Sequence, residues 1–273
     1  LSAHGDILQT LPLLSAMKKH DPSLEVGWLV DDRGKTLLTM YPDIDHLHVC
    51  PLQEWRQILR QTPWALPAVC RALVAFVHTL QAVRYDAAVD VQGLLKSAIW
   101  PWLAGIPNRY GYTRTREAAA IFYNHRLTYH NLHHPTLPTV QKFMEFMAVL
   151  DPGFDFEAPR HAVPYPTPSI PDLRYSQIAQ LVKTPQSIVV LAPGTRWHSK
   201  LWPADHWVKL VRRLSAHPNC CLMIIGAKSD KAVTEPIMSA LGHPSWLVDL
   251  IGKTGWQELF GLMSKANGCD WVR

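Results

Sequence analysis

Residues 187–207, SIVVLAPGTRWHSKLWPADHW, constrain the fold of this chain more than any other stretch. The run Ser187–Leu191 is short, apolar and β-branched, which is typical of a buried strand. Pro203–Leu214 is predicted to be a helix with proline in its first turn. A strand, a loop of backbone N–H donors and a helix N-terminus often hold a phosphate, although an ordinary βα loop shows the same pattern. The small, polar and basic residues of the loop are Gly194, Thr195, Arg196, His198, Ser199 and Lys200.

Alternating strand and helix patterns in the rest of the chain predict an α/β fold with parallel sheets. At 273 residues the chain is long enough for two domains. We expect one domain over residues 1–150, a linker with six prolines over 151–172, and a second domain over 173–273, with the boundary near residue 168. The predicted strands are 25–30, 46–50, 87–91, 220–226 and 246–250, and the predicted helices include 35–41, 65–83 and 172–183.

Composition narrows the choice of partner. A net charge of +5 and a pI near 9.0 favour an anionic partner, and without a dense Lys/Arg run we rank nucleic acid behind anionic lipid and phosphorylated substrates. Arg71 and His78 interrupt the most apolar run, Ala65–Val83, so we expect a soluble or peripheral protein without a membrane span. Five cysteines without C-x-x-C spacing favour neither zinc nor a disulfide framework, and indicate a reducing cytoplasm.

Two polar turns precede the predicted phosphate loop. Near the start, LSAHGDILQTLP places Asp6 before a helix that we expect to hold Pro12 in its first turn and to end near His20. The Asp6 carboxylate could accept a proton from a sugar hydroxyl or simply cap this helix. The second turn, DVQGLLKSAIW from Asp90, follows a predicted strand and would lie at the ligand-binding edge of the sheet. A cap for Asp90 and a solvated lysine at position 96 are the structural alternatives.

Residues 109–126 hold four arginines and one acidic residue, Glu117. Arginine forks suit carboxylate and phosphate groups, although a cluster of charges is often just a solvated face. The four arginines are Arg109, Arg114, Arg116 and Arg126.

These motifs occur in the order found in glycosyltransferase family 9, the bacterial lipopolysaccharide heptosyltransferases. Residues 193–203 resemble the family's P-G-x-R-x-x-K-x-W-P, and the start of the chain resembles S-A-x-G-D. Residues 90–98 resemble D-x-Q-G-L-x-K-S-A, which is found in the enzymes that add the first heptose. Residues 115–126 resemble S-A-R-E-x-x-A-x-x-F-Y-N-x-R, and residues 250–259 resemble L-x-G-K-T-x-x-x-E-L.

The resemblance implies two Rossmann-like domains facing each other across a cleft, the glycosyltransferase B fold. It also implies that a first strand precedes Leu1 and that the family's D-T-G-x-x-H segment and final helices follow residue 273. The implied activity is inverting, metal-independent transfer of heptose from ADP-L-glycero-D-manno-heptose to a Kdo residue of lipid A. No cofactor, no metal and no nucleic acid is implied, and the sequence has no D-x-D motif. The implied location is the cytoplasm, peripherally on the cytoplasmic face of the inner membrane, whose surface is anionic.

Site roles follow from the same resemblance. Asp6 would be the catalytic base, and Asp230, four residues after Gly226, would bind the ribose of the donor or else cap the helix that ends at Leu241. The donor-binding residues would be Gly194, Thr195, Arg196, Ser199, Lys200 and Asp230. The acceptor-binding residues would be Arg56, Gln92, Lys96, Arg116 and Arg126, of which Arg56 belongs to a Trp-Arg pair found in the family's basic acceptor loop.

The chain departs from the family in two places. Most arginines that flank the Trp-Arg pair are absent, and HHPTLPTVQKFMEFM from His133 does not match the family's H-x-V-x-R-N-R, where Lys142 is the candidate replacement. Two alternatives therefore stay open: a related transferase that adds the second heptose or another sugar, and an inactive nucleotide-binding fragment. An NAD-dependent oxidoreductase is disfavoured because no G-x-G-x-x-G follows a predicted strand.

Overall fold

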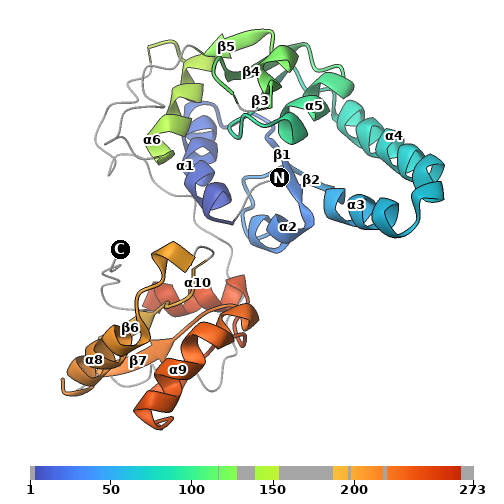
Figure 1. Ribbon diagram of the computed structural model, residues 1–273. Helices are drawn as coiled ribbons and strands as arrows, with labels where there is room; N and C mark the ends of the chain where they lie inside the picture. The colour runs from blue at the N-terminus through green and yellow to red at the C-terminus, as the bar shows by residue number, and fades with distance from the viewer. Residues whose placement is uncertain are drawn as a thin grey trace. The chain divides into compact units, whose positions relative to one another are not determined.

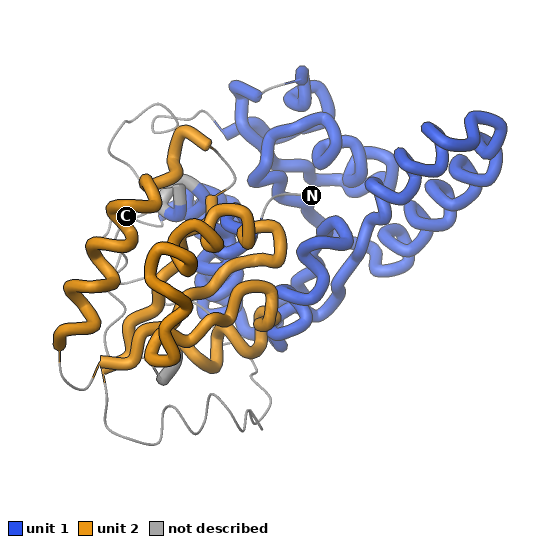
Figure 2. The backbone as a smooth tube through the Cα atoms, turned by 60° about the horizontal axis from the view of Figure 1, so that its bottom comes forward, with its two compact units in different colours: residues 1–169 blue, residues 170–273 orange. Residues whose placement is uncertain are grey.

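The computed structural model describes residues 4–115, 117–127, 139–153, 187–195, 198–217 and 220–265 (Figure 1). The chain forms two compact units, residues 1–169 and residues 170–273, coloured separately in Figure 2. Most of the predicted linker, the helix predicted at 172–183, and the site candidates Arg116 and Arg196 lie outside the described residues.

The strands described in residues 1–169 pair in parallel. One pair joins β1 (Gly27–Asp31) to β2 (His46–Cys50), in a register that sets Asp31 opposite Cys50. A second sheet has the order β3 (Ala87–Val89), β4 (Asn108–Tyr112), β5 (His125–Leu127). Parallel pairing needs crossover connections, which contain the helices Asp32–Leu38 and Leu95–Leu103 and, between β4 and β5, the 3₁₀ turn Ala119–Phe122.

Helix α1 (His4–His20) differs from the expectation for Pro12. The helix begins at His4, so Pro12 is its ninth residue and not part of its first turn. A mid-helix proline removes one backbone hydrogen bond, but Ile7, Leu11 and Leu14 form a buried stripe at helical spacing that offsets this loss. The other helices of this unit are α2 (Asp32–Leu38), α3 (Leu52–Gln61), α4 (Leu66–Val83), α5 (Leu95–Leu103) and α6 (Thr139–Met144), with 3₁₀ turns η1 (Pro63–Ala65), η2 (Ala119–Phe122) and η3 (Glu145–Val149).

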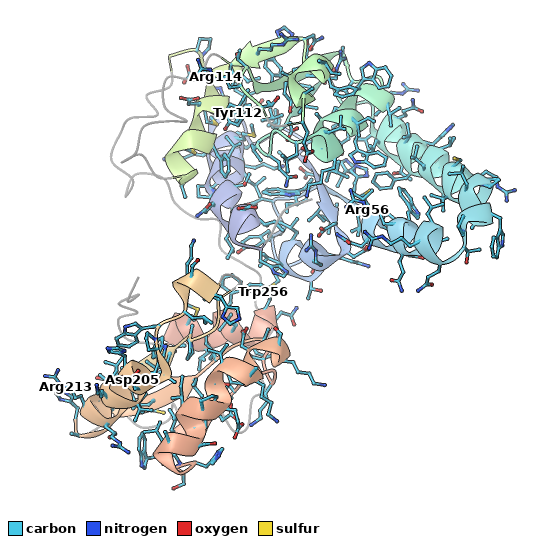
Figure 3. All side chains as sticks on the ribbon, viewed as in Figure 1. Arg56, Tyr112, Arg114, Asp205, Arg213 and Trp256 are labelled. Atoms are coloured by element: carbon cyan, nitrogen blue, oxygen red, sulfur yellow. The ribbon has the colours of Figure 1, made fainter. Side chains whose placement is uncertain are left out.

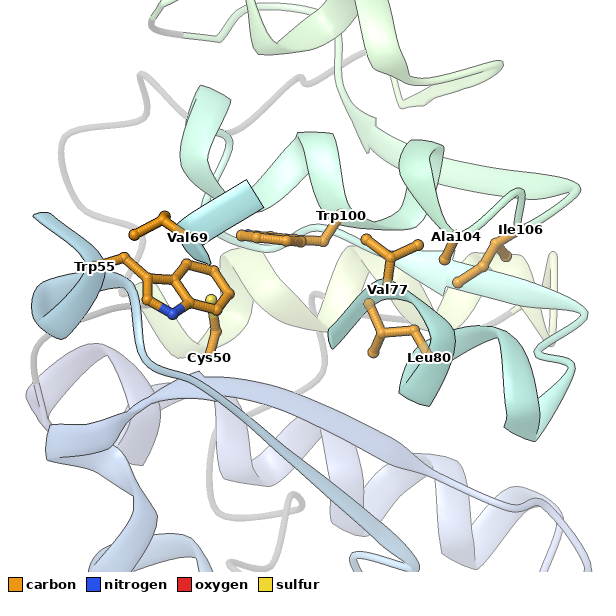
Figure 4. Packing of buried hydrophobic residues seen from close by; sticks show 8 residues of the cluster. All are labelled: Cys50, Trp55, Val69, Val77, Leu80, Trp100, Ala104 and Ile106. Carbon is orange, nitrogen blue, oxygen red and sulfur yellow. The ribbon is translucent and has the colours of Figure 1, made fainter. Parts of the chain in front are cut away.

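Helix α3 was not predicted from the sequence, and aromatic packing explains why it forms. Its buried residue Trp55 lies against Trp100 of α5, with ring centroids 6.2 Å apart, and Phe76 of α4 meets Trp100 edge-on at 5.2 Å. Each such buried aromatic side chain contributes about 2 kcal/mol of transfer free energy. Figure 4 shows the cluster, which consists of Cys50, Trp55, Val69, Val77, Leu80, Trp100, Ala104 and Ile106.

Residues 170–273 contain a βαβαβα arrangement. The parallel sheet has the order β6 (Ser187–Leu191), β7 (Cys220–Ile224), β8 (Leu247–Asp249). Side chains of β7 alternate between two hydrophobic clusters, because successive residues of a strand point to opposite faces. Leu222 packs with α8 (Ala204–Ser215) and α9 (Lys231–Leu241), whereas Met223 packs with α10 (Trp256–Lys265), so helices cover both faces of the sheet.

The argument that Arg71 and His78 interrupt the apolar run does not by itself exclude a membrane span. The helical stretch Pro63–Val83 is long and apolar enough to cross a membrane by length and composition, even though Arg71 and His78 lie within it. Only 17% of its most apolar window is buried inside the protein. The cysteines that the structure describes, Cys50, Cys70, Cys220 and Cys221, are free.

Candidate functional site

Asp6 lies in the first turn of α1 with its side chain exposed. The helix already begins at His4, so Asp6 is not the residue that precedes and caps it. Its backbone carbonyl accepts a hydrogen bond from the Thr10 hydroxyl at 2.8 Å, which fixes the turn without using the carboxylate. The exposed carboxylate is therefore not needed to hold this turn.

A buried acid and an arginine, both missed by the sequence analysis, lie beside this turn. The ring Nε2 of His4 is 2.9 Å from the carbonyl oxygen of Arg33, which ties the start of α1 to the β1–α2 junction. Arg33 donates from Nε and Nη2 to Oδ2 of Asp31, at 3.1 and 2.5 Å. Burial opposes ionisation of Asp31, but the hydrogen bonds and charge of Arg33 outweigh it and hold the pKa of Asp31 below its usual value. The polar residues directly after the apolar strand, VDDRGK, were the available signal.

Asp90 organises the turn between β3 and α5. It is 7% exposed, and its Oδ1 accepts hydrogen bonds from the backbone N–H groups of Gln92 and Gly93 at 2.9 and 3.2 Å. Its Oδ2 accepts from the Ser97 hydroxyl at 2.9 Å and from the Tyr123 hydroxyl at 2.6 Å. This carboxylate is saturated by its own chain, so its role is structural.

The F-Y-N stretch of the arginine-rich segment also holds the fold together. Burial, with a further contribution from the charge and hydrogen bond of Asp90, raises the pKa of Tyr123 far above its usual value. The Asn124 side chain accepts from the Arg109 backbone N–H at 2.7 Å, and Arg109 Nε donates to the Phe122 carbonyl at 2.8 Å. Arg109 is therefore a structural residue, while Arg126 on β5 is exposed.

The remaining acceptor candidates lie on three elements. Gln92 and Lys96 are half-buried in the β3–α5 turn and the first turn of α5. Arg56, labelled in Figure 3, is exposed on α3, which follows the carboxyl end of β2 at Cys50. Because Cys50 pairs with Asp31, α3 leaves the sheet at the same edge as the Asp31–Arg33 pair.

In residues 170–273 the loops after β6 and β7 meet. The Gly194 backbone lies so close to the Asp230 carboxylate that a Cβ atom built on Gly194 would overlap it. Asp230 lies half-exposed at the end of the 3₁₀ turn η6 (Lys228–Asp230), and its Oδ2 accepts from the Ala227 backbone N–H at 2.8 Å. It precedes α9 but makes no side-chain capping bond to that helix. Asp230 and Gly194 are thus brought together at the carboxyl edge of the sheet, where ligands of such folds bind.

The described residues of the predicted phosphate loop differ in exposure. Thr195 is half-buried, whereas Ser199 and Lys200 are exposed in the 3₁₀ turn η5 (His198–Lys200). Helix α8 begins at Ala204 with Pro203 as the capping residue, one position later than expected. Asp205, labelled in Figure 3, places a negative charge in the first turn of α8 and pairs with Lys209 at 3.5 Å. Asp205 would repel a phosphate bound at the start of α8, so the positive charge of Lys200 is needed to attract it.

Parallel sheets connected by helices, with polar loops at their carboxyl edges, define Rossmann-like units. Among solved structures, the fold is similar to "E. coli heptosyltransferase WaaC with ADP-2-deoxy-2-fluoro heptose", with a TM-score of 0.70 and 23% identity over 97% of this chain and 78% of that one. It is also similar to "E. coli ADP-heptose lps heptosyltransferase II", with a TM-score of 0.69 and 18% identity over 97% of this chain and 75% of that one. The predicted fold class is confirmed.

The family model "Glycosyltransferase family 9 (heptosyltransferase)" matches residues 73–269, so the chain belongs to glycosyltransferase family 9. Curated relatives include lipopolysaccharide heptosyltransferase 1 of Escherichia coli K12, 24% identical over 78% of this chain and 62% of the relative. The protein of the same name from Pseudomonas aeruginosa is 28% identical over 78% of this chain and 56% of the relative. The chain thus spans about three fifths of the length of these relatives, and the family resemblance is confirmed.

Proposed function

We propose that the protein transfers heptose from ADP-L-glycero-D-manno-heptose to a Kdo residue of lipid A, in the biosynthesis of the lipopolysaccharide inner core. The observation that carries the proposal is the close approach of Gly194 to Asp230. This contact supports the proposal, because a sugar nucleotide needs a loop that binds its phosphates beside a carboxylate that binds its ribose. Membership of glycosyltransferase family 9 supports heptose as the transferred sugar.

The donor would lie along the loops after β6 and β7. In this proposal Asp230 accepts the ribose hydroxyls, and the loop residues Thr195, Arg196, Ser199 and Lys200 hold the diphosphate. Negative charge grows on the diphosphate as its bond to the sugar breaks, and fixed donors and cations stabilise it. Lys200 is exposed, and its long, flexible side chain carries a positive charge that can approach the diphosphate.

Asp6 would act on the acceptor. It takes the proton from the attacking Kdo hydroxyl while that oxygen forms a bond to the anomeric carbon of heptose. The bond between that carbon and the diphosphate breaks on the opposite side, so configuration inverts, ADP leaves, and the proton stays on Asp6. This route needs no metal ion, because the leaving group is stabilised by the loop.

The acidic acceptor would meet a basic set of side chains. Arginine and lysine complement the carboxylates of Kdo and the phosphates of lipid A. The proposed contacts are Arg56, Gln92, Lys96, Arg116 and Arg126. Since lipid A is anchored in a bilayer, the proposed location is the cytoplasmic face of the inner membrane, with peripheral attachment to its anionic surface.

A product assay tests the proposal. The purified protein is incubated with ADP-heptose and either Kdo-lipid A or the same acceptor already carrying one heptose. The masses of the products are then measured by mass spectrometry. We expect one heptose to be added to the first acceptor. Addition only to the second acceptor would instead support a second-heptose transferase, which the similarity to heptosyltransferase II makes the main rival. Micromolar binding of ADP by calorimetry without turnover on either acceptor would support an inactive nucleotide-binding fragment.

A further inference from the structure

We infer that helices α3 and α4, with the turn between them, form a membrane-docking surface that lies in the plane of an anionic bilayer. This surface is defined as residues 52–83 and is named the α3–α4 hairpin. Three large apolar side chains stand out on it: Trp64 is 81% exposed, Leu66 53% and Val74 52%. An exposed apolar group of this kind marks an interaction site in a soluble protein.

The apolar side chains form one stripe along α4. Leu66, Cys70 and Val74 are four residues apart and all exposed, so they follow one another along a single helix face. Trp64, in the turn before α4, extends this stripe at its N-terminal end. The α3–α4 hairpin therefore presents a continuous apolar edge that ends in an aromatic ring, the residue type enriched at membrane interfaces.

The buried residues of α4 show why this helix lies on a membrane instead of crossing it. Val69, Val77 and Leu80 are buried in the cluster around Trp100, seen in Figure 4. A spanning helix would have to pull these side chains out of the core of residues 1–169. Length and composition alone would allow a span, but the packing holds one stripe of α4 in the protein and leaves the neighbouring stripe of Leu66, Cys70 and Val74 for the interface.

Charge identifies the partner as anionic lipid. The α3–α4 hairpin contains one acidic residue, Glu54 at its start, and from Trp55 to Tyr85 the sequence contains no Asp or Glu and four arginines. Three of them, Arg56, Arg60 and Arg71, are exposed on α3 and α4. Arginines beside an apolar stripe let the stripe enter the interface while their guanidinium groups reach lipid phosphates. An acidic or purely apolar protein surface would not match both features at once.

The test uses two kinds of vesicle and two matched variants. The protein is sedimented with vesicles of phosphatidylethanolamine and phosphatidylglycerol, and with vesicles of phosphatidylcholine alone. We expect binding to the anionic vesicles that weakens as salt is added, and about tenfold weaker binding of the double variant Trp64→Ser/Leu66→Ser, since each lost apolar contact reduces the partition. Trp246→Ser is the control, because Trp246 is 45% exposed in residues 170–273 and should leave vesicle binding unchanged.

Four results would overturn the inference. The first is no binding of the unchanged protein to anionic vesicles at low salt, and the second is equal binding by the double variant. The third is lipid-free self-association that the double variant abolishes, which would assign the stripe to a second copy of this chain. Protein that stays with the vesicles after a carbonate wash would overturn docking in the plane and favour a span. Vesicle binding needs no sugar transfer, so this test stands or fails independently of the proposed heptose transfer.

Discussion

Asp90 in residues 1–169 and Asp230 in residues 170–273 both follow the carboxyl end of a parallel strand, but their surroundings differ. Asp90 is buried and accepts four hydrogen bonds from its own chain. Asp230 is half-exposed, accepts a backbone N–H from Ala227 and lies against a glycine. The two aspartates teach that a family motif contains both residues that hold the fold and residues that remain open to a ligand. Asp6, exposed at the start of α1, belongs with the open kind.

The largest expected effect is on Asp6. Asp6→Asn keeps the shape of the side chain but cannot take up a proton, so kcat for heptose transfer should fall by about 10²–10⁴-fold. ADP affinity and unfolding free energy should stay as they are, because the carboxylate is exposed. Asp32→Asn is the matched control for removal of a negative charge from a helix start and should lower kcat much less. Turnover by Asp6→Asn at the normal rate would rule out Asp6 as the catalytic base.

Asp90→Ala should cost the most in stability. Removing this carboxylate leaves buried donors from Gln92, Gly93 and Tyr123 unsatisfied, and we expect a loss of about 3 kcal/mol in unfolding free energy. Urea unfolding measures it. Tyr123→Phe, which removes one of the four partners, should cost about 1 kcal/mol, and Asp230→Ala should cost less than about 1 kcal/mol. Equal losses for Asp90→Ala and Asp230→Ala would remove the distinction between the two aspartates.

Glu145 and Asp31 are buried acids whose pKa values are shifted in opposite directions. Burial raises the pKa of Glu145 from 4.5 to about 7, whereas Arg33 holds the pKa of Asp31 below its usual value despite burial. Between about pH 4.5 and pH 7, Glu145 therefore keeps its proton in the folded state and releases it in the unfolded state. Its contribution to stability is complete below about pH 4.5 and is lost as the pH rises to about 7, by about 3 kcal/mol.

Glu145→Gln should remove this dependence. Unfolding free energies at pH 5 and pH 8 should then differ by less in the variant than in the unchanged protein, with the variant more stable at pH 8. A variant whose stability falls between pH 5 and pH 8 as steeply as before would assign the pH dependence to another group.

The smallest expected effect concerns the contact between Gly194 and Asp230 at the carboxyl edge of the sheet in residues 170–273. A methyl group at position 194 must displace the Asp230 carboxylate, so Gly194→Ala should weaken ADP binding about tenfold, which calorimetry would measure. Gly5→Ala is the matched control, since a Cβ at Gly5 meets no atom within 4 Å, and it should leave ADP binding unchanged. Unaltered ADP affinity in Gly194→Ala would separate the Gly194–Asp230 contact from the donor.

Local patterns predicted most of the described elements. The strands His46–Cys50 and Ser187–Leu191 have the predicted bounds, because a short strand is encoded by the pattern of the residues within it. Helix α3 was missed because its residues are mostly polar and only Trp55 is buried, so its stability comes from rings on α4 and α5. The interior position of Pro12 was missed for a similar reason, since the apolar face of α1 outweighs a local helix breaker.

The sequence by itself determined the parallel α/β class, the family, and the places where polar loops leave the sheet, because periodicity and motif spacing are properties of neighbouring residues. Only the tertiary structure decided which of those polar residues are saturated and which are open. Asp90 receives a hydrogen bond from Tyr123, 33 residues away, and Gly194 meets Asp230 from a different loop. Hydrogen-bond partners and burial of this kind arise only when distant segments pack together, so no local pattern could have revealed them.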